Sequence, residues 1–144
     1  MEVTNMLDVR ACTCANIRRA DRLITQFYEQ TLAPSGLHVT QFTLLSNIAG
    51  LKEATISQLA DWLKMDRTTL TRELKLLTQQ GLAQVEAGTD RRTRQVILTA
   101  AGQEALERAR PLWRQAQTII VKQMGDERLA ALLDELSVLE RLTQ

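Results

Sequence analysis

The side chains best suited to chemistry in this sequence form a polar and basic set within residues 66–80. They are Arg67, Thr68, Thr69, Arg72 and Lys75. In a helix they would face away from leucines spaced three and four residues apart, which supply an apolar back. Arginine and lysine bind phosphates and guanine edges, and threonine contacts phosphate oxygens or a thymine methyl group. The pattern is typical of a helix that enters the major groove of double-stranded DNA.

A second basic cluster lies where two short β-prone runs within residues 82–98 predict a hairpin. Arg91 and Arg92 would occupy its tip, where they suit the narrow, strongly negative minor groove of A·T-rich DNA. Asp90 stands beside them, and we expect its carboxylate to orient the guanidinium of Arg92 through a charge-assisted hydrogen bond. Arg94 follows the tip and extends the basic surface.

The charge distribution favours one cationic region. The net charge of +1 argues neither for nor against a polyanionic partner. Residues 64–94, however, hold seven basic and four acidic side chains, whereas residues 126–144 hold two arginines and five acids. A polar helix face alone is more often merely solvated, and basic hairpins occur on many proteins that never contact DNA. We therefore base the DNA-binding prediction on helix, tight turn and basic hairpin together.

Apolar periodicity predicts the elements that position these clusters. The expected helices cover residues 10–33, 39–49, 55–63, 66–80, 99–124 and the segment after Gly125. Thr55, Asp66 and Thr99 are expected N-caps, and Gly81 is expected to end the fourth helix.

Two details of these helices are more specific. We expect Thr40 to cap the second helix, with Val39 and Leu44 packed across the cap, and Gly50 to end it. Pro111 predicts a kink or a local break in the fifth helix.

The element order predicts a mainly α fold with a small β-hairpin wing (α+β), a winged helix-turn-helix flanked by N- and C-terminal helices. A chain of 144 residues fits a single domain over residues 1–144. Within it, residues 37–99 would form the DNA-binding lobe.

Composition excludes several classes of protein. No nucleophile with a base partner and no glycine-rich phosphate loop is present, so we do not expect an enzyme or a cofactor. One histidine and two cysteines are too few for a closed zinc site, so no metal is expected. No apolar run approaches the roughly 20 residues of a membrane span, and residues 1–8 lack the lysines of a signal peptide, so we expect a cytoplasmic protein.

The motifs also resemble a known family. The segments ISQLA at 56–60, MDRTTLTR at 65–72, QGL at 80–82, DRR at 90–92 and LT-x-x-G at 98–102 are similar to those of the MarR family of bacterial regulators. The resemblance extends from the first helix to the last. It implies that residues 66–80 form the recognition helix and that Asp90 and Arg92 form the wing pair. It also implies a homodimer, a palindromic operator, and in many members repression that is lifted by a small aromatic effector.

The sequence itself also favours a dimer. The first helix, residues 10–33, and the C-terminal region, residues 100–144, carry apolar stripes that a small chain has too little core to cover. Pairing would bury them and set two recognition helices about one turn of duplex apart. The alternative is that the two stripes pack on each other within one monomer.

The cysteines leave a further function open. Cys14 lies early in the first helix, which is similar to the peroxide-sensing branch of the MarR family, although Tyr28 is the only tyrosine here. Arg18, one turn later, would favour the reactive thiolate. The alternative is that Cys14 is buried for packing alone. If both cysteines are helical, Cys12 points away from Cys14, which disfavours a bridge within one helix.

Two other interpretations stay open. A winged helix can also bind protein, but its wing would then expose apolar or aromatic residues more often than basic ones. Met6, Met65, Trp62 and Trp113 could line a ligand pocket, although such residues at helical spacing more often belong to a core.

Overall fold

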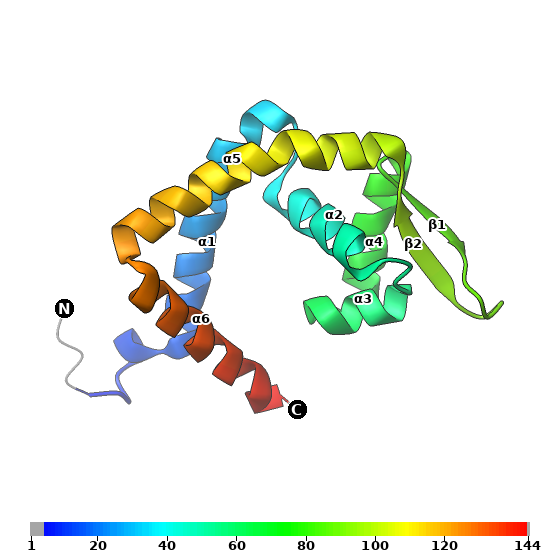
Figure 1. Cartoon of the computed structure of the whole chain (residues 1–144). Coiled ribbons are helices and arrows are strands. Elements are labelled where there is room, and N and C mark those ends of the chain that lie inside the picture. Colours follow the sequence, from blue (N-terminus) through cyan, green and yellow to red (C-terminus); the bar gives the residue numbers. More distant parts are fainter. Residues whose placement is uncertain (1–4, 144) are drawn as a thin grey trace.

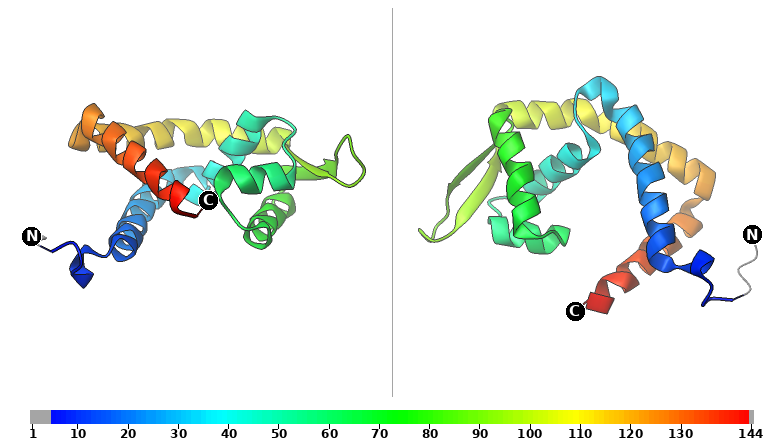
Figure 2. Two further views of the ribbon diagram at one scale, coloured as in Figure 1. Left: turned by 90° about the horizontal axis from the view of Figure 1, so that it is seen from below. Right: turned by 180° about the vertical axis from the view of Figure 1, so that it is seen from behind.

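The chain is arranged around one long helix, α5 (Ala100–Met124), in a computed structural model that describes residues 5–143. α1 (Thr13–Leu32) and α6 (Asp126–Glu140) lie toward one end of α5 in Figure 1. The other end carries a lobe of three helices and a hairpin, and both views of Figure 2 show the same separation. The N-terminal end of α5 is therefore joined to the hairpin and its C-terminal end to α6.

The lobe has the element order of a winged helix-turn-helix, which confirms the expected fold class. It contains α2 (Val39–Leu51), α3 (Ile56–Leu63), α4 (Arg67–Gln79), β1 (Ala83–Ala87) and β2 (Arg94–Leu98). Short 3-10 turns at Val9–Ala11, Ala33–Ser35 and Arg141–Thr143 complete the described chain. β1 and β2 pair antiparallel from Ala83 opposite Leu98 to Ala87 opposite Arg94.

The hydrophobic core lies inside this lobe and against the first half of α5. Its fully buried members include Leu45, Leu59, Leu70, Leu77, Val96 and Leu106. Each buried leucine contributes about 1.5–3 kcal/mol relative to an exposed one. The helix-turn-helix thus has a core of its own, and α5 completes it.

Capping residues explain where α3, α4 and α5 begin. The backbone N–H of Gln58 donates to the hydroxyl of Thr55 at 3.1 Å, and that of Gly102 donates to Thr99 at 3.0 Å. The predicted caps of α3 and α5 are confirmed, as is Gly81 with its left-handed φ of 73° after α4.

α2 begins at Val39, as expected, but its predicted N-cap and its predicted end were wrong. The N-cap is His38, whose backbone N–H donates to Oε1 of Gln41 at 3.0 Å, so Thr40 lies inside the helix and the expected staple across it is not formed. α2 also continues past Gly50 to Leu51. It ends where the next two residues adopt left-handed backbone conformations, with φ of 40° at Lys52 and 55° at Glu53.

α5 continues through Pro111 without a break. A kink or a local break was expected at this proline, and the local break is wrong. Figure 1 shows a long helix with a curved path. No helix of the described residues is long and apolar enough to cross a bilayer.

Candidate nucleic-acid interface

α4 has one buried face and one exposed face. Leu70, Leu74 and Leu77 are 0%, 2% and 1% exposed, so they fix the helix on the core. The side chains of Arg67, Thr68, Arg72 and Lys75 are exposed, and those of Thr68, Arg72 and Lys75 lie opposite the leucines by helical periodicity. The structure thus gathers these predicted site residues on one accessible surface.

The N-terminus of α4 is held by Asp66. Its Oδ1 accepts from the backbone N–H of Thr69 at 2.7 Å, and its Oδ2 accepts from the Thr69 hydroxyl at 2.8 Å. The hydrogen bond from the Thr69 backbone is the main cause that lowers the pKa of Asp66, and the charge of Arg72 adds to it. Thr69, predicted as a DNA contact, is half-buried and its hydroxyl proton is already engaged in this cap.

The turn before α4 is tight. Lys64 adopts a left-handed conformation with φ of 54°, and the backbone N–H of Met65 returns to the carbonyl oxygen of Ala60 at 3.0 Å. This geometry joins α3 and α4 in the helix-turn-helix arrangement.

The hairpin tip projects from the lobe in Figure 1, and Arg91, Arg92 and Arg94 are exposed on it. None of these arginines takes part in an ion pair within the part of the chain that the structure describes. Three guanidinium groups therefore remain available to an anionic partner at the tip and along β2.

Asp90 has a different role from the one expected. Its Oδ1 accepts from the backbone N–H of Arg92 at 3.1 Å, and its carbonyl oxygen accepts from the backbone and hydroxyl of Thr93. The expected bond to the Arg92 guanidinium is not formed, and the carboxylate binds the backbone two residues on instead. Asp90 therefore shapes the tip and leaves the arginine side chains free.

The wing is tied to the rest of the lobe by a third stretch of chain. The backbone N–H of Val96 donates to the carbonyl oxygen of Ala54 at 3.0 Å, and Thr55 forms an isolated antiparallel bridge with Gln95. The start of α3 and the wing therefore move together, which fixes the wing relative to the helix-turn-helix.

Both cysteines lie exposed at the start of α1. The alternative that Cys14 is buried by packing within its own subunit is therefore wrong. Cys12 is the N-cap of α1 and lies outside its helical residues. The expectation that Cys12 points away from Cys14 assumed that both are helical, so it does not apply.

An apolar groove of about 900 Å³ lies between α1, α5 and α6. Side chains on its walls include Ile17, Leu23, Ile24, Ile120, Leu132, Leu133 and Leu136. Leu23 and Leu133 stay 61% and 56% exposed, so the two stripes do not cover each other within one chain. That alternative is wrong, and the groove is open.

The four residues considered for a ligand pocket do not meet in one place. Met6 and Trp62 are 77% and 65% exposed. Met65 packs against the core, and the ring of Trp113 stacks on Phe42 with centroids 5.9 Å apart. None of the four lines the apolar groove.

Comparisons with known proteins agree with this geometry. A family model described as MarR family matches residues 35–93. The uncharacterized HTH-type transcriptional regulator YwoH of Bacillus subtilis (strain 168) is 29% identical over 91 residues, which cover 63% of this chain and 66% of that protein.

Solved structures extend the match to nearly the whole chain. The Mycobacterium tuberculosis transcriptional regulator MosR, in complex with DNA, is 39% identical with a TM-score of 0.82 and covers 92% of this chain and 98% of its own. The PcaV regulator of Streptomyces coelicolor, in complex with its natural ligand, has a TM-score of 0.85 over 96% of this chain and 98% of its own. Its identity of 14% supports the fold alone.

The basic helix, the tight turn and the protruding wing define a winged helix-turn-helix regulator rather than an enzyme. With the family model over the lobe and MosR over nearly the full length, the chain belongs to the MarR family of transcriptional regulators.

Proposed function

We propose that this regulator is a homodimer that binds a palindromic site in double-stranded DNA, with α4 in the major groove and the wing in the minor groove. The observation that carries the proposal is the two-sided character of α4. Leu70, Leu74 and Leu77 are almost completely buried, while its basic outer face and the arginines of the wing are exposed. Residues 37–99 form the DNA-binding lobe of this proposal, and residues 10–33 and 100–144 form the dimer.

The open groove supports the dimer. Exposed leucines on α1 and α6 would be removed from water by a second copy, and each fully buried leucine contributes about 1.5–3 kcal/mol. Two-fold symmetry would repeat α4 and the wing on the neighbouring turn of the duplex. Weak contacts to each half-site would then combine into useful affinity.

We further propose that binding represses transcription and that a small aromatic effector releases the protein from DNA. This part rests on the resemblance to the family.

The decisive experiment is to select bound duplexes from a random pool and to measure affinity against salt concentration. We expect a palindromic consensus, a steep loss of affinity as salt rises, and a preference of at least roughly 10³-fold over a scrambled duplex. Small aromatic compounds are then screened for release of the selected duplex. A purified protein that stays monomeric, or that ignores duplex at low ionic strength, would refute the proposal.

A second function is favoured by the exposed cysteines. In it, Cys14 senses peroxide: its thiolate attacks one peroxide oxygen, the O–O bond breaks, sulfenic acid forms, and the second oxygen leaves as hydroxide or water. The measurement compares DNA affinity before and after hydrogen peroxide in the parent, Cys14→Ser and Cys12→Ser proteins. Oxidation of Cys14 in the parent without a change in affinity would exclude this function.

A further inference from the structure

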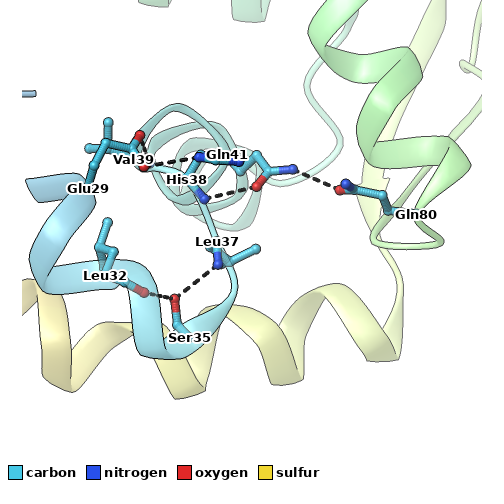
Figure 3. Close-up of polar contacts among 8 residues, drawn as sticks. All are labelled: Glu29, Leu32, Ser35, Leu37, His38, Val39, Gln41 and Gln80. Atoms are coloured by element: carbon cyan, nitrogen blue, oxygen red, sulfur yellow. Dashed lines mark hydrogen bonds and ion pairs between the residues drawn. The ribbon is translucent and has the colours of Figure 1, made fainter. Parts of the chain in front are cut away.

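Gln41 is a buried polar residue within the core of the lobe. Its side chain is on α2, the residue is 9% exposed, and both ends of its amide are bonded. Oε1 accepts from the backbone N–H of His38 at 3.0 Å, and Nε2 donates to Oε1 of Gln80 at 2.8 Å. Figure 3 shows this amide extending from α2 toward the end of α4.

The partner, Gln80, is the C-cap of α4. The next residue, Gly81, accepts a hydrogen bond of 2.6 Å from the hydroxyl of Thr99 at the start of α5. The C-terminal end of α4 is thus held from two directions, by α2 through Gln41 and by α5 through Thr99. Its N-terminal cap, by contrast, joins Asp66 to Thr69 within the same element.

Gln41 is itself anchored to α1. Oε1 of Glu29 accepts from the backbone N–H of Val39 at 2.9 Å, and Oε2 lies 3.0 Å from Nδ1 of His38. The first turn of α2 is therefore bound to the last turns of α1, as Figure 3 shows. A continuous set of hydrogen bonds runs from α1 through α2 to the end of α4.

We infer that Gln41 is a positioning residue for the recognition helix: through Gln80 it sets the direction in which α4 presents Arg72 and Lys75 to DNA. The inference rests on the proposed DNA-binding function and adds a determinant of specificity that lies outside the contact surface. A buried amide that loses its partner must find another, and the C-terminal end of α4, still packed through its leucines and clamped by Thr99, would shift and tilt the helix slightly. Sequence-specific contacts depend on that tilt, whereas phosphate attraction depends mainly on charge.

The test uses Gln80→Met, because Gln80 is exposed and its substitution leaves the core intact. Gln80→Glu is the rescue variant, since its carboxylate still accepts from Nε2 of Gln41. Gln79→Met and Gln79→Glu are matched controls for apolarity and for charge at the neighbouring exposed position. Gln41→Met and the double variant Gln41→Met/Gln80→Met complete a double-mutant cycle.

Each protein is titrated with the selected duplex and with a scrambled duplex of equal length, at a temperature where circular dichroism shows it folded. We expect Gln80→Met and Gln41→Met to lose roughly five- to tenfold in the ratio of specific to scrambled affinity, as the loss of one hydrogen bond implies. Binding to the scrambled duplex should not change. The double variant should lose no more than either single variant, and Gln80→Glu should match Gln79→Glu.

A merely structural role would lower binding to both duplexes equally through a smaller folded fraction, and that result would overturn the inference. An unchanged ratio in folded Gln80→Met would overturn it as well. If the parent protein does not discriminate between the duplexes, the proposed function fails first, so the two failures are distinguishable.

Discussion

The hydroxyl of Thr99 donates a hydrogen bond of 2.6 Å to the carbonyl oxygen of Gly81 and so joins the start of α5 to the end of α4. The same hydroxyl accepts from the backbone N–H of Gly102 at 3.0 Å as the N-cap of α5. One side chain therefore serves both the long helix and the helix that carries the basic surface.

Replacing Thr99 should weaken both connections. We expect Thr99→Val to lower the free energy of unfolding by about 1–2 kcal/mol, as for other lost N-caps, and Thr99→Ser to retain most of it. Urea denaturation followed by circular dichroism measures the difference. Equal stability of the valine and serine variants would contradict the assignment.

Gly102 lies in the first turn of α5 and close to the backbone of Leu82. A Cβ placed on Gly102 would lie 1.9 Å from the carbonyl oxygen of Leu82, which is backbone and cannot rotate away. Gly102→Ala should therefore destabilise the protein by about 1–3 kcal/mol. Gly50→Ala is the matched control in α2, because nothing lies within 4 Å of its Cβ; there we expect stabilisation of about 0.5–1 kcal/mol. Melting temperatures that shift in the same direction would refute this reasoning.

The cap of α4 should depend on pH. Bonds from Thr69 lower the pKa of Asp66 below its ordinary value of 3.8, so the carboxylate stabilises the fold at neutral pH. That stabilisation is present above the unfolded-state pKa and is lost as the pH falls through the lower folded-state pKa. Asp66→Asn can cap without titrating, so the melting-temperature advantage of the parent over this variant should shrink below about pH 4. An advantage that stays constant from pH 7 to pH 3 would argue against it.

The two basic elements should contribute differently to DNA binding. Arg92→Ala should weaken binding across sequences and reduce the salt slope by about one. Arg72→Ala should cost about 1–3 kcal/mol and relax base preference where it contacts a base edge. Arg128→Ala, an exposed substitution on α6, is the control. Affinities of both variants equal to that of the parent would refute the interface.

The groove predicts which leucine supports the dimer. Leu133 lines it and is 56% exposed, so Leu133→Glu should place a charge in the seam and shift the protein toward a monomer. Val138, 41% exposed, lies on the opposite side of α6 by helical periodicity, and Val138→Glu should leave the assembly intact. Sedimentation equilibrium distinguishes the two. A parent protein that sediments as a monomer would remove the basis of this prediction.

Features with a local cause were predictable from the sequence. Thr55, Asp66 and Thr99 cap helices because each side-chain oxygen meets a backbone N–H three residues on. Such contacts depend on the nearest residues alone, so residue type and spacing were enough. The polar and apolar faces of α4 were predictable for the same reason.

Features with a distant cause were not predictable from the sequence. The N-cap of α2 is His38 and not Thr40, and the first turn is held by Glu29, which lies ten residues upstream of Val39 and accepts its backbone N–H. The bond between Gln41 and Gln80 spans 39 residues, and no local pattern indicates it. One local signal pointed to the true N-cap. Gln41 stands three residues after His38, which is the spacing of a capping box.

The unbroken course of α5 has a mechanical consequence. With 25 residues, it is about 38 Å long, and its two ends belong to the groove and to the wing. A continuous helix of that length can act as a lever: a rotation of about 5° at the leucine seam would displace the far end by roughly 3 Å, the length of one hydrogen bond. A small rotation at the contact between two subunits would therefore change the distance between the two copies of α4 and the wing.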